Sequence, residues 1–276
     1  MNVLCEICPH GCQIEEGHTG FCGARGNRGG QVTAVNYGKV TSLALDPIEK
    51  KPLHRFMPGS HILSVGSFGC NLRCPYCQNC EISMADGNTA QTDELSPEQL
   101  VDKALELRRR GNIGIAYTYN EPLIGYEFVY DCAVLAHQHG LKNVLVTNGY
   151  ICEKPLKEIL PMIDAMNIDL KGFTEEFYKK LSGDLETVKQ TIALSSKHCH
   201  IEVTTLVIPG ENDGADEMAA LSKWLGGVHP DIPLHLSRFF PRYQYKDKNP
   251  TPPETLCRLR DMAKQNLNYV YLGNIW

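Results

Sequence analysis

The sequence predicts an α/β fold: a partial (β/α)6 barrel of the TIM type with a small cysteine-rich N-terminal extension. Three observations lead to this prediction. From residue 61 onward, short apolar runs alternate with longer amphipathic segments, as in parallel strands joined by crossover helices. The 276 residues suffice for one barrel-sized domain with an appendage. The first 30 residues, by contrast, combine four cysteines with many glycines and show little apolar periodicity.

These differences divide the chain into three parts. Residues 1–30 form a cysteine-rich metal-binding knuckle, because a stretch with so few apolar residues needs a bound metal for stability. Residues 31–60 form a hairpin and linker, since apolar and polar residues alternate over 31–45 on both sides of an Asn-Tyr-Gly turn. Residues 61–276 form the barrel.

Strands and helices of the barrel follow from the pattern of apolar residues. A helix is expected after Ser96, which can cap it together with Gln99 while Pro97 takes the first helical position, and Gly111 ends it. A second helix places its apolar residues of 128–136 on one face and closes at Gly140. The expected strands lie at 61–68, 114–119, 143–148, 165–170, 201–208, 233–239 and 268–273.

Charge and hydropathy exclude two classes of partner. The formal charge is −5, and acidic and basic residues are interspersed, so no basic face would attract nucleic acid. No apolar run approaches the roughly 20 residues that span a bilayer, and the first residues lack the basic and apolar parts of a signal peptide. We therefore expect no membrane partner and a cytoplasmic location.

The segment GCNLRCPYCQN contains a C-x3-C-x2-C motif directly after the first expected barrel strand. Cys70, Cys74 and Cys77 are close enough in sequence to bind three irons of one four-iron four-sulfur cluster, and the fourth iron would keep an open position. The alternative is a zinc knuckle in which Cys80 is the fourth ligand. The position of the motif on a strand-to-loop junction favours the cluster.

Further polar residues stand where the expected strands end. In α/β barrels the carboxyl ends of the strands build the active site, so these residues are candidates for ligand binding. They are Asn120, Glu121, Thr147, Asn148, Asp169, Lys171 and Arg238.

The N-terminal cysteines form a second possible metal site. Eight of the twelve cysteines fall into two tight clusters, which suits metal coordination better than a disulfide framework. Cys5, Cys8, Cys12 and Cys22 offer four thiolates, and zinc and an auxiliary iron–sulfur cluster suit them equally. The scattered cysteines are expected to be apolar fillers: Cys132, Cys152, Cys199 and Cys257.

The cysteine motif resembles the signature of the radical S-adenosylmethionine (SAM) superfamily, including an aromatic residue, Tyr76, before the last cysteine. Further segments resemble the AmmeMemoRadiSam-type enzymes, which are relatives of the pyruvate formate-lyase (glycyl radical enzyme) activating enzymes. In chain order they are CEICPHGC, DPIEKKPL, GCNLRCPYCQN, AYTYNEP, TNGY, NIDLKG, LVIPGENDG, SRFFPRY and YVYLGN.

This resemblance implies a radical SAM barrel and a set of cofactor contacts. Asn120 and Glu121 would receive the SAM amino group, and Arg238 a carboxylate of SAM or substrate, although a rim salt bridge is an alternative for Arg238. Tyr76, Thr147, Asn148, Asp169 and Lys171 complete the contacts, although the last two could form a simple ion pair. Two positions depart from the activating enzymes, which usually have Asp and Arg where this chain has Val146 and Thr204.

The implied reaction is reductive cleavage of SAM to methionine and a 5′-deoxyadenosyl radical that abstracts hydrogen from an unidentified small molecule or protein. Flavodoxin or ferredoxin would supply the electron, and Memo-like and AMMECR-like proteins are possible partners by resemblance. One alternative is an activase of a glycyl-radical enzyme. Another is a non-catalytic iron–sulfur or zinc protein.

Overall fold

The computed structural model describes residues 1–275 and has an eight-stranded sheet at its centre. The strand order is β14-β13-β12-β11-β10-β9-β7-β6, and every neighbouring pair is parallel except β6 and β7. The strands are β6 (Ser42–Pro47), β7 (His61–Gly66), β9 (Asn112–Tyr117), β10 (Lys142–Thr147), β11 (Ala165–Asp169), β12 (His200–Val207), β13 (Leu234–Arg238) and β14 (Val270–Gly273). This is the predicted partial barrel of α/β type, with one antiparallel strand added at its edge.

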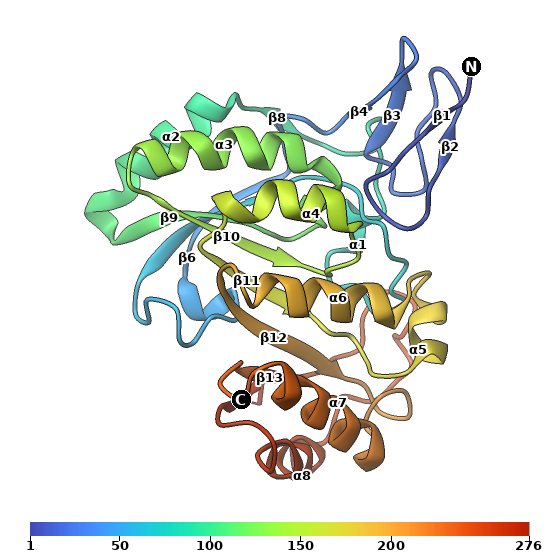
Figure 1. Cartoon of the computed structure of the whole chain (residues 1–276), viewed down its shortest axis with the longest axis vertical. Helices are drawn as coiled ribbons and strands as arrows, with labels where there is room; N and C mark the ends of the chain where they lie inside the picture. Colours follow the sequence, from blue (N-terminus) through green and yellow to red (C-terminus); the bar gives the residue numbers. More distant parts are fainter. Residues whose placement is uncertain (276) are drawn as a thin grey trace.

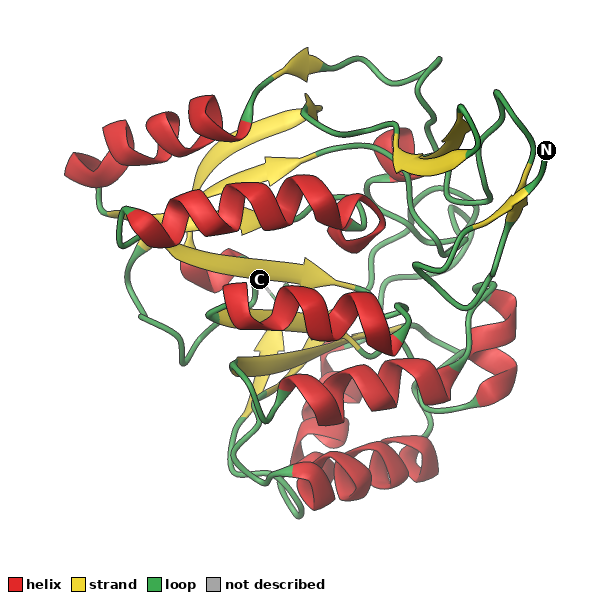
Figure 2. Cartoon of the chain, turned by 45° about the horizontal axis from the view of Figure 1, so that its top comes forward, coloured by secondary structure: helices red, strands yellow, loops and turns green. Residues whose placement is uncertain are grey.

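Helices cover one face of the sheet (Figures 1 and 2). Each of the seven expected strand segments contains a strand, and helices follow in the crossovers. The α-helices are α1 (Cys80–Ser83), α2 (Pro97–Glu106), α3 (Tyr126–Gln138), α4 (Glu153–Ile159), α5 (Glu175–Lys180), α6 (Leu185–Ser195), α7 (Ala215–Val228) and α8 (Pro253–Ala263). Short 3-10 turns lie at Ile48–Lys50, Leu107–Arg110, Pro122–Gly125 and Leu160–Met162.

The predicted start of α2 is confirmed in detail. The Ser96 hydroxyl accepts a hydrogen bond from the Gln99 amide, and the Gln99 side-chain oxygen accepts one from the Ser96 amide. Pro97 occupies the first turn, and Gly111, at φ +82°, caps the 3-10 turn that extends the helix. Helix α3 likewise buries the apolar face expected at 128–136.

The hairpin predicted over 31–45 is wrong. Strand β4 (Gln31–Ala34) pairs instead with β3 (Arg25–Arg28), through the Gly29–Gly30 turn. Strand β5 (Lys39–Val40) pairs with β8 (Asp93–Glu94), and β6 joins the main sheet beside β7. Both turn glycines have positive φ, which suits a tight hairpin, whereas the sheet edge offers β6 a longer partner.

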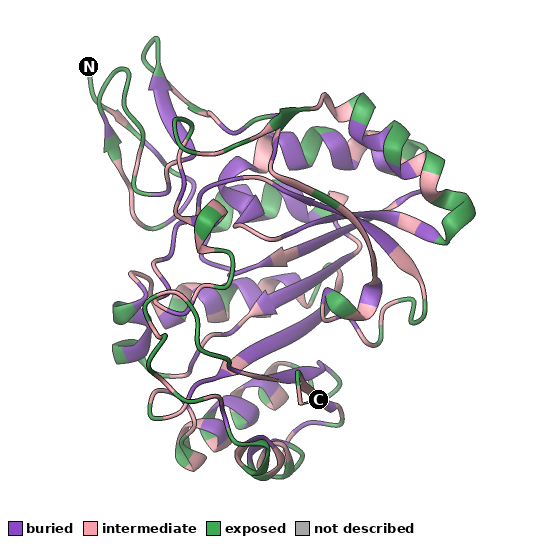
Figure 3. Ribbon diagram, turned by 180° about the vertical axis from the view of Figure 1, so that it is seen from behind, coloured by how far each residue is buried: buried purple, intermediate pink, exposed green. Residues whose placement is uncertain are grey.

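The cysteine-rich N-terminus folds as small hairpins beside the barrel. Strand β1 (Val3–Leu4) pairs with β2 (Gln13–Ile14), and both lie with β3 and β4 at one corner of the molecule, near α1 (Figure 1). The central strands are almost wholly buried (Figure 3), whereas this corner is more exposed. Across residues 1–275, we find no helix long and apolar enough to cross a bilayer.

A buried carboxylate, Glu202, joins several segments by hydrogen bonds at the end of the barrel where β12 begins. Glu202 is fully buried and accepts hydrogen bonds from the backbone amides of His54 and Arg55, at 3.0 and 2.7 Å. The rings of His200 and His235 donate to it at 3.0 and 2.6 Å. Burial opposes the charge of Glu202, but these hydrogen bonds outweigh burial and lower its pKa to about 2.

Replacing this carboxylate is expected to weaken the fold in a pH-dependent way. Glu202→Gln should lower the free energy of unfolding by about 3 kcal/mol at pH 7, because buried donors lose their anionic acceptor. Since the folded-state pKa is depressed, the contribution is present above the unfolded pKa of about 4.5 and is lost as pH falls toward about 2. Urea unfolding between pH 7 and pH 3 measures both effects.

Glu176→Gln provides the matched control, because Glu176 is exposed and lies 3.9 Å from Lys180. That change should cost less than about 1 kcal/mol. Equal costs for both variants at pH 7 would contradict this account of the buried cluster.

Candidate functional site

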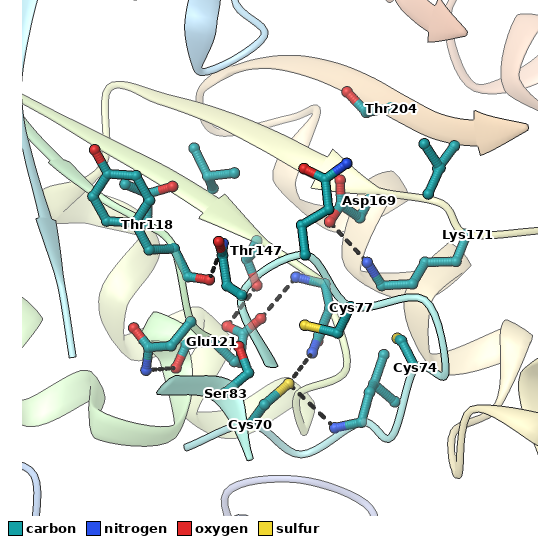
Figure 4. A pocket seen from close by; sticks show the side chains of 18 of the residues that line it. Cys70, Cys74, Cys77, Ser83, Thr118, Glu121, Thr147, Asp169, Lys171 and Thr204 are labelled. Carbon is teal, nitrogen blue, oxygen red and sulfur yellow. Dashed lines mark hydrogen bonds and ion pairs between the residues drawn. The ribbon is translucent and has the colours of Figure 1, made fainter. Parts of the chain in front are cut away.

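A cavity of about 340 Å³ opens at the carboxyl ends of the barrel strands. Its wall combines the loop after β7 with the ends of β9, β10, β11 and β12, and Figure 4 shows polar side chains from all of them directed into the same space. The volume lies at the lower end of the range for small-molecule sites. This is the edge of the sheet at which the sequence predicted the site.

All three cysteines of the C-x3-C-x2-C motif line this cavity (Figure 4). The loop begins after Gly69, whose φ of +86° and close packing exclude a side chain: a Cβ there would lie 2.6 Å from the Cys22 carbonyl oxygen. The Cys70 sulfur accepts a hydrogen bond from the Leu72 amide at 3.4 Å, and the Cys77 amide donates to the Cys74 carbonyl at 3.1 Å. Cys80 starts α1 and is not part of the cavity wall formed by the described residues.

Asn120 ties this loop to the end of β9. Its side-chain nitrogen donates to the carbonyls of Phe68 and Gly69, at 3.1 and 3.2 Å, and its side-chain oxygen accepts from the Ser67 amide at 3.0 Å. The side-chain amide group of Asn120 is therefore occupied by the backbone just before the cysteine loop. Asn120 borders the cavity, but its hydrogen bonds position the loop.

Glu121 links the ends of β9 and β10. Its carboxylate accepts from the Leu123 amide at 2.9 Å and from the Thr147 hydroxyl and Asn148 amide, both at 2.7 Å. Burial raises its pKa to about 7, although these hydrogen bonds act in the opposite direction. Of the roughly four acceptor directions of a carboxylate, three are occupied and one remains for a ligand.

Asn148 connects β10 to the cysteine loop. Its side-chain nitrogen lies 3.6 Å from the Cys70 sulfur and donates to the Asn71 side-chain oxygen at 2.9 Å, while its own oxygen accepts from the Tyr150 amide. Asn71 in turn donates to the Tyr150 carbonyl at 2.6 Å. The Thr-Asn pair predicted from the sequence thus sits beside the first cysteine.

Asp169 and Lys171 form an ion pair of 2.8 Å at the end of β11. Burial opposes the charge of Lys171, but the facing Asp169 outweighs it and raises the lysine pKa above its ordinary value. The simple ion pair considered in the sequence analysis is therefore present, and both residues also line the cavity (Figure 4).

Tyr76 is buried between aromatic rings. Its ring centroid lies 6.3 Å from Phe177 and 6.0 Å from Tyr245. The Tyr76 hydroxyl is buried without a hydrogen-bond partner among the described residues, and Tyr76 lines the cavity. A buried unpaired hydroxyl is costly, so this group is available to a ligand.

Arg238 is not part of the cavity wall. Its Nε donates to the Thr251 carbonyl at 2.7 Å, and its guanidinium lies 4.9 Å from the centre of the Phe240 ring. The neighbouring Ser237 lines the cavity instead. Side chains alternate between the two faces of a strand, which explains why the prediction for β13 was displaced by one position.

A lysine of the cavity wall was missed by the residue-level prediction. Lys51 is 4% exposed, pairs with Asp46 at 2.8 Å and lies 4.8 Å from the centre of the Tyr119 ring. The Tyr119 hydroxyl also donates to Asp46. The resemblance of the segment DPIEKKPL was the available signal, but the sequence does not show which of its lysines is buried.

The N-terminal cysteines converge on a second, much smaller cavity. Cys5, Cys8, Cys12 and Cys22 all line it, and burial raises the pKa of the Cys8 thiol to about 12. A metal ion would have to displace that proton. Within residues 1–275, no three His, Cys, Asp or Glu side chains already stand in a geometry that could hold a metal ion.

The donor set at the larger cavity fits an iron–sulfur cluster. Three thiols face one space. Burial raises the pKa of Cys74 to about 11, which disfavours its thiolate, and the positive charge of Lys171 acts in the opposite direction. Iron–sulfur clusters are held by cysteine thiolates, and three of them leave one iron open.

Comparison with known proteins agrees with this geometry. Residues 64–222 match the family model described as the Radical SAM superfamily. "Uncharacterized protein MJ0808" of Methanocaldococcus jannaschii is 46% identical, over 99% of this chain and 81% of the relative. The pyruvate formate-lyase 1-activating enzyme of Escherichia coli K12 is 24% identical, over 71% of this chain and 86% of the enzyme.

A solved structure shows the same fold. The domain of a pyruvate-formate lyase-activating enzyme from Bacteroides vulgatus superposes with a TM-score of 0.52 at 16% identity. The match covers 58% of this chain and 99% of that domain.

Removing the hydrogen bonds between Asn120, which follows β9, and the backbone before Cys70 should destabilise the protein. Asn120→Ala deletes three side-chain hydrogen bonds to the backbone at residues 67–69, and we expect a loss of about 2 kcal/mol in the free energy of unfolding. Urea unfolding measures it. Asn268→Ala, which removes one exposed contact with Asp231, is the control and should cost well under about 1 kcal/mol. Equal free energies of unfolding for the two variants would show that the Asn120 hydrogen bonds do not stabilise the protein.

Proposed function

Since this chain belongs to the radical SAM superfamily, we propose that Cys70, Cys74 and Cys77 hold a [4Fe–4S] cluster at which SAM is cleaved reductively. When bound, such a cluster supplies the electron that converts SAM into methionine and a 5′-deoxyadenosyl radical, which abstracts hydrogen from a substrate. The observation that carries the proposal is that the three cysteines, without Cys80, face one cavity with the ends of four parallel strands.

Three thiolates give the cluster an open position for SAM. The zinc-knuckle alternative needs Cys80 as a fourth ligand, but the described residues of the cavity wall do not include it. A closed four-thiolate shell would serve a structural role, whereas an incomplete shell leaves room for a ligand. This arrangement favours a catalytic radical SAM enzyme over a non-catalytic iron–sulfur or zinc protein.

We assign the SAM amino group to Glu121 and the SAM carboxylate to Lys171. Glu121 keeps one acceptor direction, and a neighbouring ammonium group would lower its pKa from about 7 and hold it ionised. Lys171 offers a buried cation whose present partner is Asp169. The Tyr76 hydroxyl completes the candidate contacts, because it is buried and unpaired.

Asn120, Thr147 and Asn148 act through other residues in this proposal. Asn120 fixes the cysteine loop, and Thr147 and Asn148 orient the Glu121 carboxylate. Rigid placement lowers the entropy cost of bringing SAM to the cluster. Val146 and Thr204 line the same cavity where the activating enzymes usually have Asp and Arg, so those two contacts are replaced here by apolar and hydroxyl groups.

The substrate of the proposed radical is a small molecule or a protein, and the electron donor is a flavodoxin or ferredoxin. The AmmeMemoRadiSam-type resemblance adds Memo-like and AMMECR-like proteins as partners. A glycyl-radical activase is the second candidate, because a relative named as a pyruvate formate-lyase activating enzyme aligns over 71% of this chain. An activase would remove one backbone hydrogen from a partner's glycine.

The Cys74→Ala variant tests the proposed chemistry. After anaerobic reconstitution with iron and sulfide and full reduction, the wild-type protein should convert SAM into 5′-deoxyadenosine and methionine, and Cys74→Ala should form neither above background. Chromatography of both products with time is the measurement. Absence of both products from wild-type protein with a verified, reduced cluster would overturn the proposal.

Cys257→Ala is the matched control. Cys257 lies on α8, outside the cavity wall described here, and should retain wild-type product formation. This control separates loss of a cluster ligand from loss of any cysteine.

A further inference from the structure

The four N-terminal cysteines surround a cavity of a different kind from the SAM site. Its volume is about 10 Å³, roughly that of a single water-sized sphere. Ile7, Ile14 and Ile124 supply much of the remaining wall. Such a space has room for one metal ion among four thiolates, whereas a cubane of four irons and four sulfides would require the surrounding turns to move apart.

The backbone brings the four cysteines together. Strands β1 and β2 pair side by side, and the Cys5 amide donates to the Cys12 carbonyl at 2.9 Å. The Gly11 amide donates to the Cys8 carbonyl at 3.2 Å, in a turn that Gly11 makes at φ +52°. Gly20 packs so closely that a Cβ there would lie 3.3 Å from the Cys12 sulfur. The position of Gly20 therefore has little room for a side chain.

We propose that Cys5, Cys8, Cys12 and Cys22 bind a single Zn²⁺ ion, and that this zinc centre holds the Cys70 loop in position. Four thiolates are the ligand set of a closed structural zinc site. The thiols would turn inward on binding, since no ready-made ligand group exists among residues 1–275. The zinc site stands independently of the proposed SAM chemistry, and its positioning role rests on that chemistry.

Direct contacts join the zinc centre to the loop of the SAM site. The Cys70 amide donates to the Cys22 carbonyl at 3.2 Å. A proposed ligand of the iron–sulfur cluster is thus hydrogen-bonded through its backbone to a proposed ligand of the zinc ion. His10 Nε2 lies 2.8 Å from the Asn71 carbonyl oxygen. Each of these contacts depends on the conformation of the cysteine turns.

Phe21 adds a third contact, next to Cys22. The Arg73 guanidinium donates to the Phe21 carbonyl and lies 4.0 Å from the centre of the Phe21 ring. Arg73 also donates to the carbonyls of Cys70 and Leu72, at 2.7 and 3.0 Å. Phe21 thus reaches the cysteine loop through Arg73, and a metal that fixes Cys22 fixes this contact as well.

Metal analysis tests the site without reference to SAM. In a variant with Cys70, Cys74 and Cys77 all changed to Ala, grown with zinc and iron, we expect one zinc per chain by mass spectrometry. Adding Cys12→Ser should abolish that zinc, and adding Cys257→Ser should not. Zinc absent from the triple variant and from wild type, four irons with sulfide in its place, or zinc retained after Cys12→Ser would each overturn the site.

The positioning role is tested on the holoenzyme with Phe21→Ala, which leaves all seven cysteine ligands intact. We expect this variant to keep its zinc but to release iron from the reconstituted cluster to a ferrous chelator roughly tenfold faster than wild type. The electron paramagnetic resonance signal of the reduced cluster should also shift. Tyr37→Ala, at an exposed aromatic of similar size, is the control and should match wild type. Unchanged iron release and an unchanged spectrum in Phe21→Ala would contradict the positioning role.

Discussion

The hydrogen bonds that fix the Cys70–Cys77 loop against the ends of β9 and β10 are the constraint on which the rest of the site depends. Asn120 holds the backbone just before Cys70, and Asn148 contacts the Cys70 sulfur. Glu121 joins the two strand ends by accepting from Thr147 and from the Asn148 amide. Leu72, Cys74 and Tyr76 of this loop are buried in the core, and the hydrogen bonds fix the direction in which its thiols point.

The same arrangement explains why polar residues are buried at one edge of an otherwise apolar sheet. Glu121 and Thr147 are each 2% exposed, yet their polar groups are paired with one another. Buried polar groups are tolerated when they are satisfied, and a satisfied network is rigid. At the cavity, the free acceptor direction of Glu121 and the Tyr76 hydroxyl remain open to a ligand.

The barrel was largely predictable from the sequence, because the seven expected strands and the first two crossover helices have local signals. Ser96 and Gln99 predicted the start of α2, and the capping box is present. The segment 31–45 was misassigned because alternation of apolar residues does not say which partner a strand will choose. Its strands pair with β3, β8 and β7, which lie elsewhere in the sequence.

At the site, motif spacing predicted which residues gather but not what they contact. Cys70, Cys74, Cys77, Glu121 and Lys171 meet in one cavity as expected. Asn120 hydrogen-bonds to the backbone, and Arg238 hydrogen-bonds to the Thr251 carbonyl. Both contacts depend on the direction of the side chain, which the residue types alone do not determine.

The central claim is that three cysteines leave one iron of a cluster open to SAM. The most direct measurement is electron–nuclear double resonance on the reduced protein with SAM carrying ¹⁵N at its amino group and ¹⁷O at its carboxylate. The account predicts couplings from both labels to the cluster. A verified, reduced cluster with SAM present and no coupling from either label would contradict it.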